Sequence, residues 1–126
     1  MDPDLLGERE LDVMTLLWQH SSGTVAEVQE LLGTPLAYTT VLTILRNLEA
    51  KGFVRREEEG RAHRYFPRVK QRAAQRRALR RLVDTLFLGS PEALLAQLVD
   101  DNDLTPDNLR RIAKRLDHRQ GDGGDA

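Results

Sequence analysis

The sequence contains no cysteine, which excludes disulfide bonds and every metal site built on thiolate ligands. It also lacks any run of 18 apolar residues, so no segment is expected to insert into a membrane. The acidic start, Met1-Asp2-Pro3-Asp4, has none of the basic-then-apolar character of a signal peptide. These absences favour a cytoplasmic protein.

Positive charge is scarce at both ends of the chain and abundant in the middle. The formal net charge is −1. Residues 1–34 carry a net −6, residues 35–81 a net +9 and residues 82–126 a net −4. A basic central segment is what neutralising a polyanion such as nucleic acid requires. For the arginines after residue 70, a solvated helix surface explains the pattern equally well.

Two helices are predicted near the amino terminus, over about residues 7–19 and 25–32. His20-Ser21-Ser22-Gly23 breaks the first helix, and Thr24 with Glu27 forms the capping-box pattern that starts the second. Helical spacing of the apolar residues identifies the side chains expected to face the core. They are Leu11, Met14, Leu17 and Trp18 in the first helix, and Val28, Leu31 and Leu32 in the second.

A third helix, over residues 37–51 and closed by Gly52, follows a short Gly/Pro turn, which is the spacing of a helix-turn-helix. Successive residues lie about 100° apart, so Val41, Ile44, Leu45 and Leu48 gather on the core side. The opposite side carries Thr39, Thr43, Arg46 and Ala50, with Leu42 at its margin. Such side chains suit contacts to base edges and phosphates. Taken alone, a polar solvent face is the commoner explanation of this pattern.

Residues 53–66 predict a strand–turn–strand hairpin. Two strands, 53–56 and 62–66, flank a turn that contains Glu57-Glu58-Glu59-Gly60. Four cations lie on this short hairpin, and phosphate contact is their direct explanation; they are Arg55, Arg56, Arg61 and Arg64. The glutamates are placed at the tip, either outside a duplex or paired with Arg61 and Arg64. A helix-turn-helix followed by a basic hairpin predicts a winged-helix domain over residues 1–69, in a chain that is mainly α with a small β-hairpin wing.

Three amphipathic helices are predicted over residues 70–119, and a disordered tail over 120–126. The first helix spans residues 71–88. The second begins at Ser90-Pro91 and the third at Thr105-Pro106, each with an N-cap residue followed by proline. Roughly 50 residues give too small a core for independent stability, so these helices are expected to form a dimerisation domain. The apolar residues expected at that interface are Leu79, Leu82, Val83, Leu86, Phe87, Leu94, Leu95, Leu98, Leu109, Ile112 and Leu116.

Several segments resemble the BlaI/MecI/CopY (penicillinase repressor) family across about residues 6–118. They are residues 11–18, 37–45, 51–54 and 61–65. The resemblance implies a winged-helix repressor that binds a palindromic double-stranded DNA operator as a homodimer. Carried over by position, the recognition helix supplies Thr39, Thr40, Leu42, Thr43 and Arg46, and the wing supplies Arg61, His63 and Arg64.

The chain departs from the family pattern at two points. Copper-responsive members use carboxy-terminal Cys-x-Cys pairs, which this chain lacks. β-Lactam-responsive members are cleaved at an Asn–Phe bond, where this sequence has Gln97-Leu98. Cleavage at this or another bond stays open, and with it a membrane metalloprotease sensor encoded nearby as a partner.

The sequence disfavours two other classes of function and leaves a third open. An enzyme is disfavoured, because His20, His63 and His118 are scattered and no phosphate-binding glycine loop occurs, so no catalytic, metal or cofactor residue is assigned. A regulator that responds to a metal or small ligand without proteolysis stays open, since ligands can assemble from dispersed residues. A winged-helix protein–protein adaptor is disfavoured by the +9 central segment.

Overall fold

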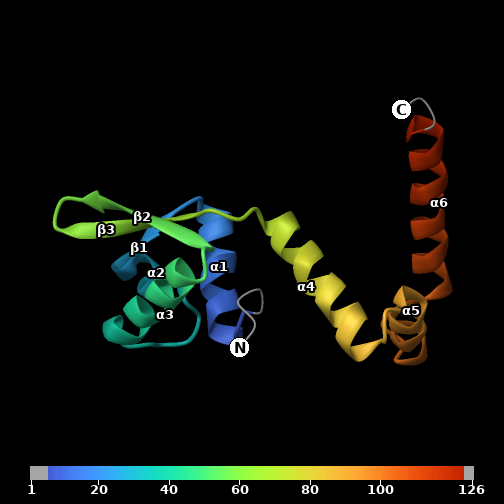
Figure 1. Ribbon diagram of the computed structural model, residues 1–126, viewed down its shortest axis with the longest axis horizontal. Helices are drawn as coiled ribbons and strands as arrows, with labels where there is room; N and C mark the ends of the chain where they lie inside the picture. The colour runs from blue at the N-terminus through green and yellow to red at the C-terminus, as the bar shows by residue number, and fades with distance from the viewer. Residues whose placement is uncertain (1–5, 124–126) are drawn as a thin grey trace. The chain divides into compact units, whose positions relative to one another are not determined.

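The computed structural model describes residues 6–123, with side chains through residue 119 (Figure 1). Six helices and three strands follow one another: α1 Glu8–His20, β1 Gly23–Thr24, α2 Val25–Leu31, α3 Tyr38–Ala50, β2 Val54–Glu59, β3 Ala62–Pro67, α4 Gln71–Leu86, α5 Pro91–Asp100 and α6 Pro106–Gly123. The chain divides into two compact units, one ending at Arg80 and the other beginning at Arg81. The division lies within α4, because Val69 and Ala74 still pack against the core of the first unit.

Local capping explains where the first helices begin. Gly7 is the N-cap of α1, and its backbone N–H donates to Glu10 Oε1 at 2.9 Å. The predicted capping box of α2 is confirmed: Glu27 N donates to Thr24 Oγ1 at 3.2 Å, and Thr24 N donates to Glu27 Oε2 at 3.1 Å. These two hydrogen bonds satisfy two backbone N–H groups that have no partner within the helix, which fixes the start of the helix.

The hydrophobic core lies among α1, α2, α3 and the base of the hairpin. Its buried members are Val13, Met14, Leu17, Val25, Val28, Val41, Ile44, Leu45, Leu48, Phe53, Val54 and Tyr65. The prediction for α3 is confirmed in full. It is wrong for Leu11 and Leu31, which are 48% and 46% exposed, because the inward arc of α1 centres on Val13 and Leu17 and that of α2 on Val25 and Val28. Trp18 and Leu32 are partly buried against the same core.

The sheet has three antiparallel strands in the order β1-β3-β2. Strand β1 was not predicted, since two residues carry no periodicity; Gly23 pairs with Tyr65 and Thr24 with Arg64. The hairpin is longer than predicted. Glu57, Glu58 and Glu59 lie within β2 rather than in the turn, because the pairing of Glu59 with Ala62 leaves a two-residue loop.

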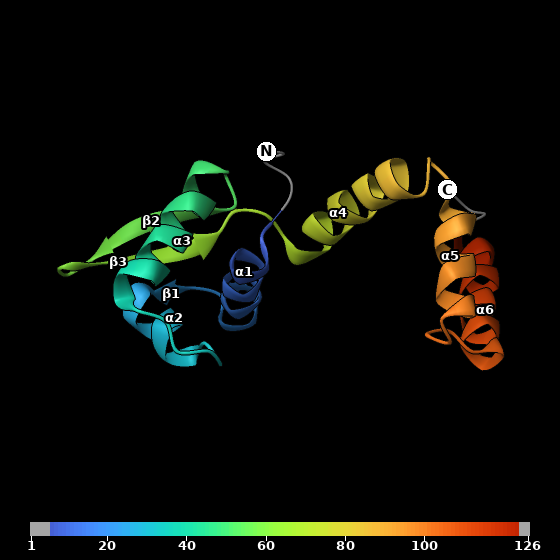
Figure 2. The ribbon, with the colours of Figure 1, turned by 90° about the horizontal axis from the view of Figure 1, so that it is seen from below.

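That loop consists of Gly60 and Arg61. Gly60 has φ +62°, a conformation that glycine adopts without steric cost. Both views show the hairpin continuing as a two-stranded ribbon beyond α2 and α3 (Figures 1 and 2).

Helices α4, α5 and α6 begin and end close to the predicted positions. Ser90 Oγ accepts from Ala93 N at 3.1 Å, and Thr105 Oγ1 accepts from Asn108 N at 3.2 Å, so both predicted caps are formed. Helix α6 continues to Gly123, four residues beyond residue 119, the predicted end of the helical domain. The rest of the predicted tail, residues 124–126, lies outside the described residues.

Within residues 6–123, no single helix is both long enough and apolar enough to cross a membrane. Helices α4 and α5 have that length and apolar composition only when they are taken together, as a bent pair.

Candidate nucleic-acid interface

One face of α3 is exposed and carries mostly short polar side chains. Thr39, Thr43 and Arg46 are exposed along it, while Leu42 at its margin is half-buried against the core. Thr40 is also exposed, on the first turn. The buried side chains of the opposite face hold the helix rigidly, so the exposed side chains present a fixed pattern of donors and acceptors.

The hydrogen bond on this face joins two threonines, and Arg46 beside them is exposed. Thr43 Oγ1 donates to Thr39 O at 2.9 Å, a bond that uses the hydroxyl proton and leaves the oxygen lone pairs as acceptors. Arg46 is exposed and makes no ion pair with any residue of the described part of the chain. A guanidinium in this state can donate two parallel bonds to a guanine edge or to a phosphate.

The wing arginines are mostly paired with glutamates. Arg55 pairs with Glu57 and lies 4.4 Å from the centroid of the Phe66 ring, in cation–π contact. Arg56 Nε lies 3.5 Å from a carboxylate oxygen of Glu49. Both pairs are about half exposed, so each is weak enough for a phosphate to replace the glutamate.

Arg61 and His63, unlike the other basic residues of the wing, form no ion pair with a glutamate of the described residues. Arg61 stands in the exposed turn and forms no ion pair with a residue of the described ranges. His63 is half-buried on β3, opposite Glu58. Of the two arrangements expected for the glutamates, pairing with Arg61 is not formed among the described residues, and residues 57–59 lie along β2 rather than at the tip.

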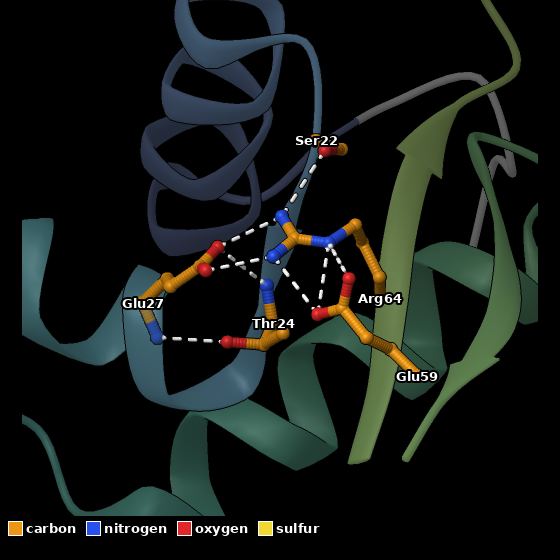
Figure 3. A network of polar contacts seen from close by, with 5 residues as sticks. All are labelled: Ser22, Thr24, Glu27, Glu59 and Arg64. Atoms are coloured by element: carbon orange, nitrogen blue, oxygen red, sulfur yellow. Dashed lines mark hydrogen bonds and ion pairs between the residues drawn. The ribbon is translucent and has the colours of Figure 1, made fainter.

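Arg64 is the centre of a network of polar contacts between the hairpin and the start of α2 (Figure 3). Its guanidinium contacts Glu27, Glu59 and Ser22, and its side chain is only 22% exposed. Pairing of a glutamate with Arg64, one of the two arrangements expected for residues 57–59, is confirmed for Glu59, and the guanidinium donors have acceptors within the chain. Hydrogen bonds from Arg64 and from the Thr24 backbone lower the pKa of Glu27, and the two carboxylates raise the pKa of Arg64.

Sequence reasoning found Glu27 only as a helix cap. Its second role, as the partner of Arg64, depends on β1 bringing residues 37 positions apart together. The two-residue strand that does so has no signal in the sequence.

The apolar face of the carboxy-terminal helices is largely exposed in the single chain. Of the predicted interface residues, Leu79, Leu82, Leu86, Leu95, Ile112 and Leu116 are exposed by 36–71%, and Phe87, Leu94, Leu98 and Leu109 are half-buried. Val83 is 5% exposed, so it is buried within the chain and is not free for a partner. In addition, Leu88 is 91% exposed and has φ +51°, an unusual backbone conformation for leucine.

A hollow of about 510 Å³ lies between α1 and the end of α2. It is bordered by Glu8, Arg9, Asp12, Leu31 and Thr34. Among the described residues, no three acidic or imidazole side chains are grouped closely enough to hold a metal ion.

Comparison with known proteins identifies the family. Residues 6–118 match the family model described as penicillinase repressor. Over 65 residues the chain is 45% identical to the transcriptional regulator BlaI of Mycobacterium tuberculosis, covering 49% of this chain and 47% of that protein. The chain thus spans about half the length of this relative. It is 21% identical over 117 residues to the penicillinase repressor of Bacillus licheniformis, covering 91% of each.

Two further likenesses agree with this match. The methicillin resistance regulatory protein MecI of Staphylococcus aureus is 18% identical over 116 residues, covering 90% of this chain and 94% of MecI. The solution structure of the DNA-binding domain of the repressor BlaI superposes with a TM-score of 0.51 at 30% identity, over 56% of this chain and 88% of that domain. With most of its length matched, the chain belongs to the penicillinase repressor family.

Proposed function

We propose that this protein is a transcriptional repressor that binds double-stranded DNA as a homodimer at a palindromic operator. Helix α3 enters the major groove, with Thr39, Thr43 and Arg46 toward the base edges and Leu42 toward a thymine methyl. Thr40 faces the DNA backbone. The wing contacts phosphates through Arg55 and Arg61, and His63 on the same hairpin also contacts the DNA. The observation that carries the proposal is the rigidly held, exposed polar face of α3 in a chain of this family.

The dimer is proposed from the apolar side chains of α4–α6. Helix α5 has no fully buried residue, although its sequence is rich in leucine. Exposed apolar surface of this kind is stabilised when a second copy covers it. A two-fold symmetric dimer then requires half-sites about 34–36 Å apart or a multiple of that distance.

No catalytic role is proposed. Proteolytic release by a membrane metalloprotease sensor would have to cut helical backbone if the Gln97-Leu98 bond were its target, because that bond lies within α5. Such cleavage requires local unfolding of α5 first.

The experiment is fluorescence anisotropy of the full-length protein with duplexes from upstream of its own gene. A shuffled duplex of equal length and composition serves as the control. Tighter binding to the upstream duplex, weakening steeply with salt, supports the proposal. Equal affinity for both duplexes contradicts it.

A further inference from the structure

We propose that Arg64 is a positioning residue that locks the wing onto the start of α2, and that it is not a phosphate ligand. The proposal rests on the DNA-binding function above. It assigns a function to the one wing arginine whose side chain is mostly covered.

All five N–H donors of the Arg64 guanidinium have acceptors (Figure 3). Nη1 donates to Ser22 Oγ at 3.2 Å and Glu27 Oε2 at 2.9 Å. Nη2 donates to Glu27 Oε1 at 2.8 Å and Glu59 Oε2 at 3.0 Å. Nε donates to Glu59 Oε1 at 3.1 Å. Because a guanidinium has five donors in a fixed fork, no donor remains for a phosphate oxygen.

The position of Arg64 in the sheet explains what this network does. Thr24 pairs with Arg64, and this is the last pair that joins the hairpin to β1. Beyond it only β2 and β3 pair with each other, up to Glu59 and Ala62. An isolated two-stranded hairpin is marginally stable in water. Arg64 ties Glu59, from the projecting part, to Glu27 on α2, so the direction of the wing is fixed relative to the helix-turn-helix.

The capping box makes the anchor rigid. Glu27 Oε2 accepts from both Thr24 N and Arg64 Nη1, so the same carboxylate starts α2 and holds the wing. Lysine cannot reproduce this arrangement, since a single ammonium cannot make parallel bonds to two carboxylates.

Salt-dependent DNA affinity separates a positioning residue from a phosphate ligand. A phosphate ligand replaced by glutamine lowers the slope of log K against log salt by about 1 per protomer. We expect Arg64→Gln and Arg64→Lys to leave the slope unchanged while affinity falls about three- to thirtyfold. We expect Glu27→Gln to weaken binding as well, although it removes a negative charge. Arg61→Gln, on the same hairpin, is the matched control and should lower the slope.

Hydrogen exchange gives a readout that is independent of DNA. Amides of residues 57–63 should exchange faster in Arg64→Gln and Glu27→Gln than in Arg61→Gln. The proposal is overturned by a slope that falls by about 1 in Arg64→Gln, by unchanged affinity, or by tighter binding of Glu27→Gln. If the unmodified protein binds no duplex, the proposed function fails, and unchanged exchange of the wing amides would overturn the positioning role separately.

A different observation, the distribution of charge, carries a second inference. Residues 35–67 have six basic and four acidic residues, a net of only +2, whereas residues 68–81 have seven basic and no acidic residues. Most of the basic excess therefore lies after the wing. We infer that the first turns of α4 bind the DNA phosphate backbone through Arg72, Arg76, Arg77 and Arg80.

These arginines belong to the winged-helix unit and are uncompensated. Arg68 N donates to Phe53 O at 2.8 Å, and Ala74 packs against the core, so this part of α4 moves with the DNA-binding unit. All four side chains are exposed, and none has an ion-pair partner in the part of the chain that the structure describes. Like charges at i, i+4, such as Arg72 with Arg76, destabilise a helix, and a polyanion relieves that repulsion.

The test is the fourfold glutamine variant of these arginines, since glutamine keeps helix propensity. We expect the salt slope to fall by about 2 or more per protomer. Affinity should fall equally for preferred and shuffled duplexes, because phosphate contacts carry no sequence information. Arg111→Gln with Lys114→Gln, exposed on α6, is the control and should leave the slope unchanged. A fourfold variant with an unaltered slope, sedimenting as the unmodified protein does, would overturn the inference.

Discussion

Trp18 Nε1 donates a hydrogen bond to Val69 O at 2.9 Å, joining α1 to the segment that leads into α4, 51 residues further along the chain. The indole also packs against the core. This bond attaches the segment that leads into α4 to the winged-helix unit.

Replacing Trp18 with phenylalanine keeps an aromatic ring and removes the donor. The expected loss is about 1 kcal/mol in the free energy of unfolding, because Val69 O is left without its partner. Amides of the first turn of α4 should exchange faster, as measured by hydrogen–deuterium exchange. Unchanged exchange there would show that core packing alone holds the segment.

Replacing Arg46 with alanine should weaken operator binding by about 1–3 kcal/mol if the guanidinium pairs with a guanine. Preference at one base pair of each half-site should relax in parallel, as seen in competition with singly substituted duplexes. Arg111→Ala, an exposed arginine on α6, is the matched control. A uniform loss across all duplexes would assign Arg46 to the backbone instead.

The pair of Glu27 with Arg64 predicts a pH dependence of stability. The pKa of Glu27 is lowered from its ordinary value of 4.5, chiefly by the hydrogen bond from Arg64. The folded state thus binds this proton less tightly than the unfolded state, so the stabilisation is present above pH 4.5 and is lost as the pH falls through the folded-state pKa.

Urea denaturation of the unmodified protein and of Glu27→Gln measures this difference. The unmodified protein should be the more stable at neutral pH, and the gap should narrow as the pH falls below 4.5. A gap that is constant with pH would contradict the assignment.

Replacing Leu86 with glutamate should shift the protein toward monomer. Its side chain is 71% exposed in the single chain, so a charge there is tolerated by the fold and costly only at a covered interface. Leu11→Glu, 48% exposed on α1, is the control and should stay dimeric. Sedimentation velocity distinguishes the two results, and an unaffected Leu86→Glu dimer would place the interface elsewhere.

Much of the fold could be predicted from local patterns. The periodicity of α3 identified its four buried residues, and the capping motifs at Thr24, Ser90 and Thr105 located three helix starts. These features depend on residues close in sequence. The family assignment rested on the same segments and is confirmed.

The errors came from long-range geometry. Strand β1 is too short to have a pattern, yet it brings Glu27 against Arg64, so that an arginine expected on the wing surface lies within a network of ion pairs. A run of three glutamates suggested a turn, whereas strand pairing extends through Glu59. Leu11 and Leu31 fit helical spacing but lie at the edge of the inward arc, where burial is decided by the neighbouring elements.

Selection of binding sites from a random duplex library, using the full-length protein, tests the central claim most directly. A homodimer reading DNA through α3 should recover inverted repeats with half-site centres about 34–36 Å apart or a multiple of that distance. Arg46→Ala should recover the same repeat with one position relaxed in each half. Recovery of sites without two-fold symmetry, or of no common sequence, would contradict a dimeric operator-binding repressor.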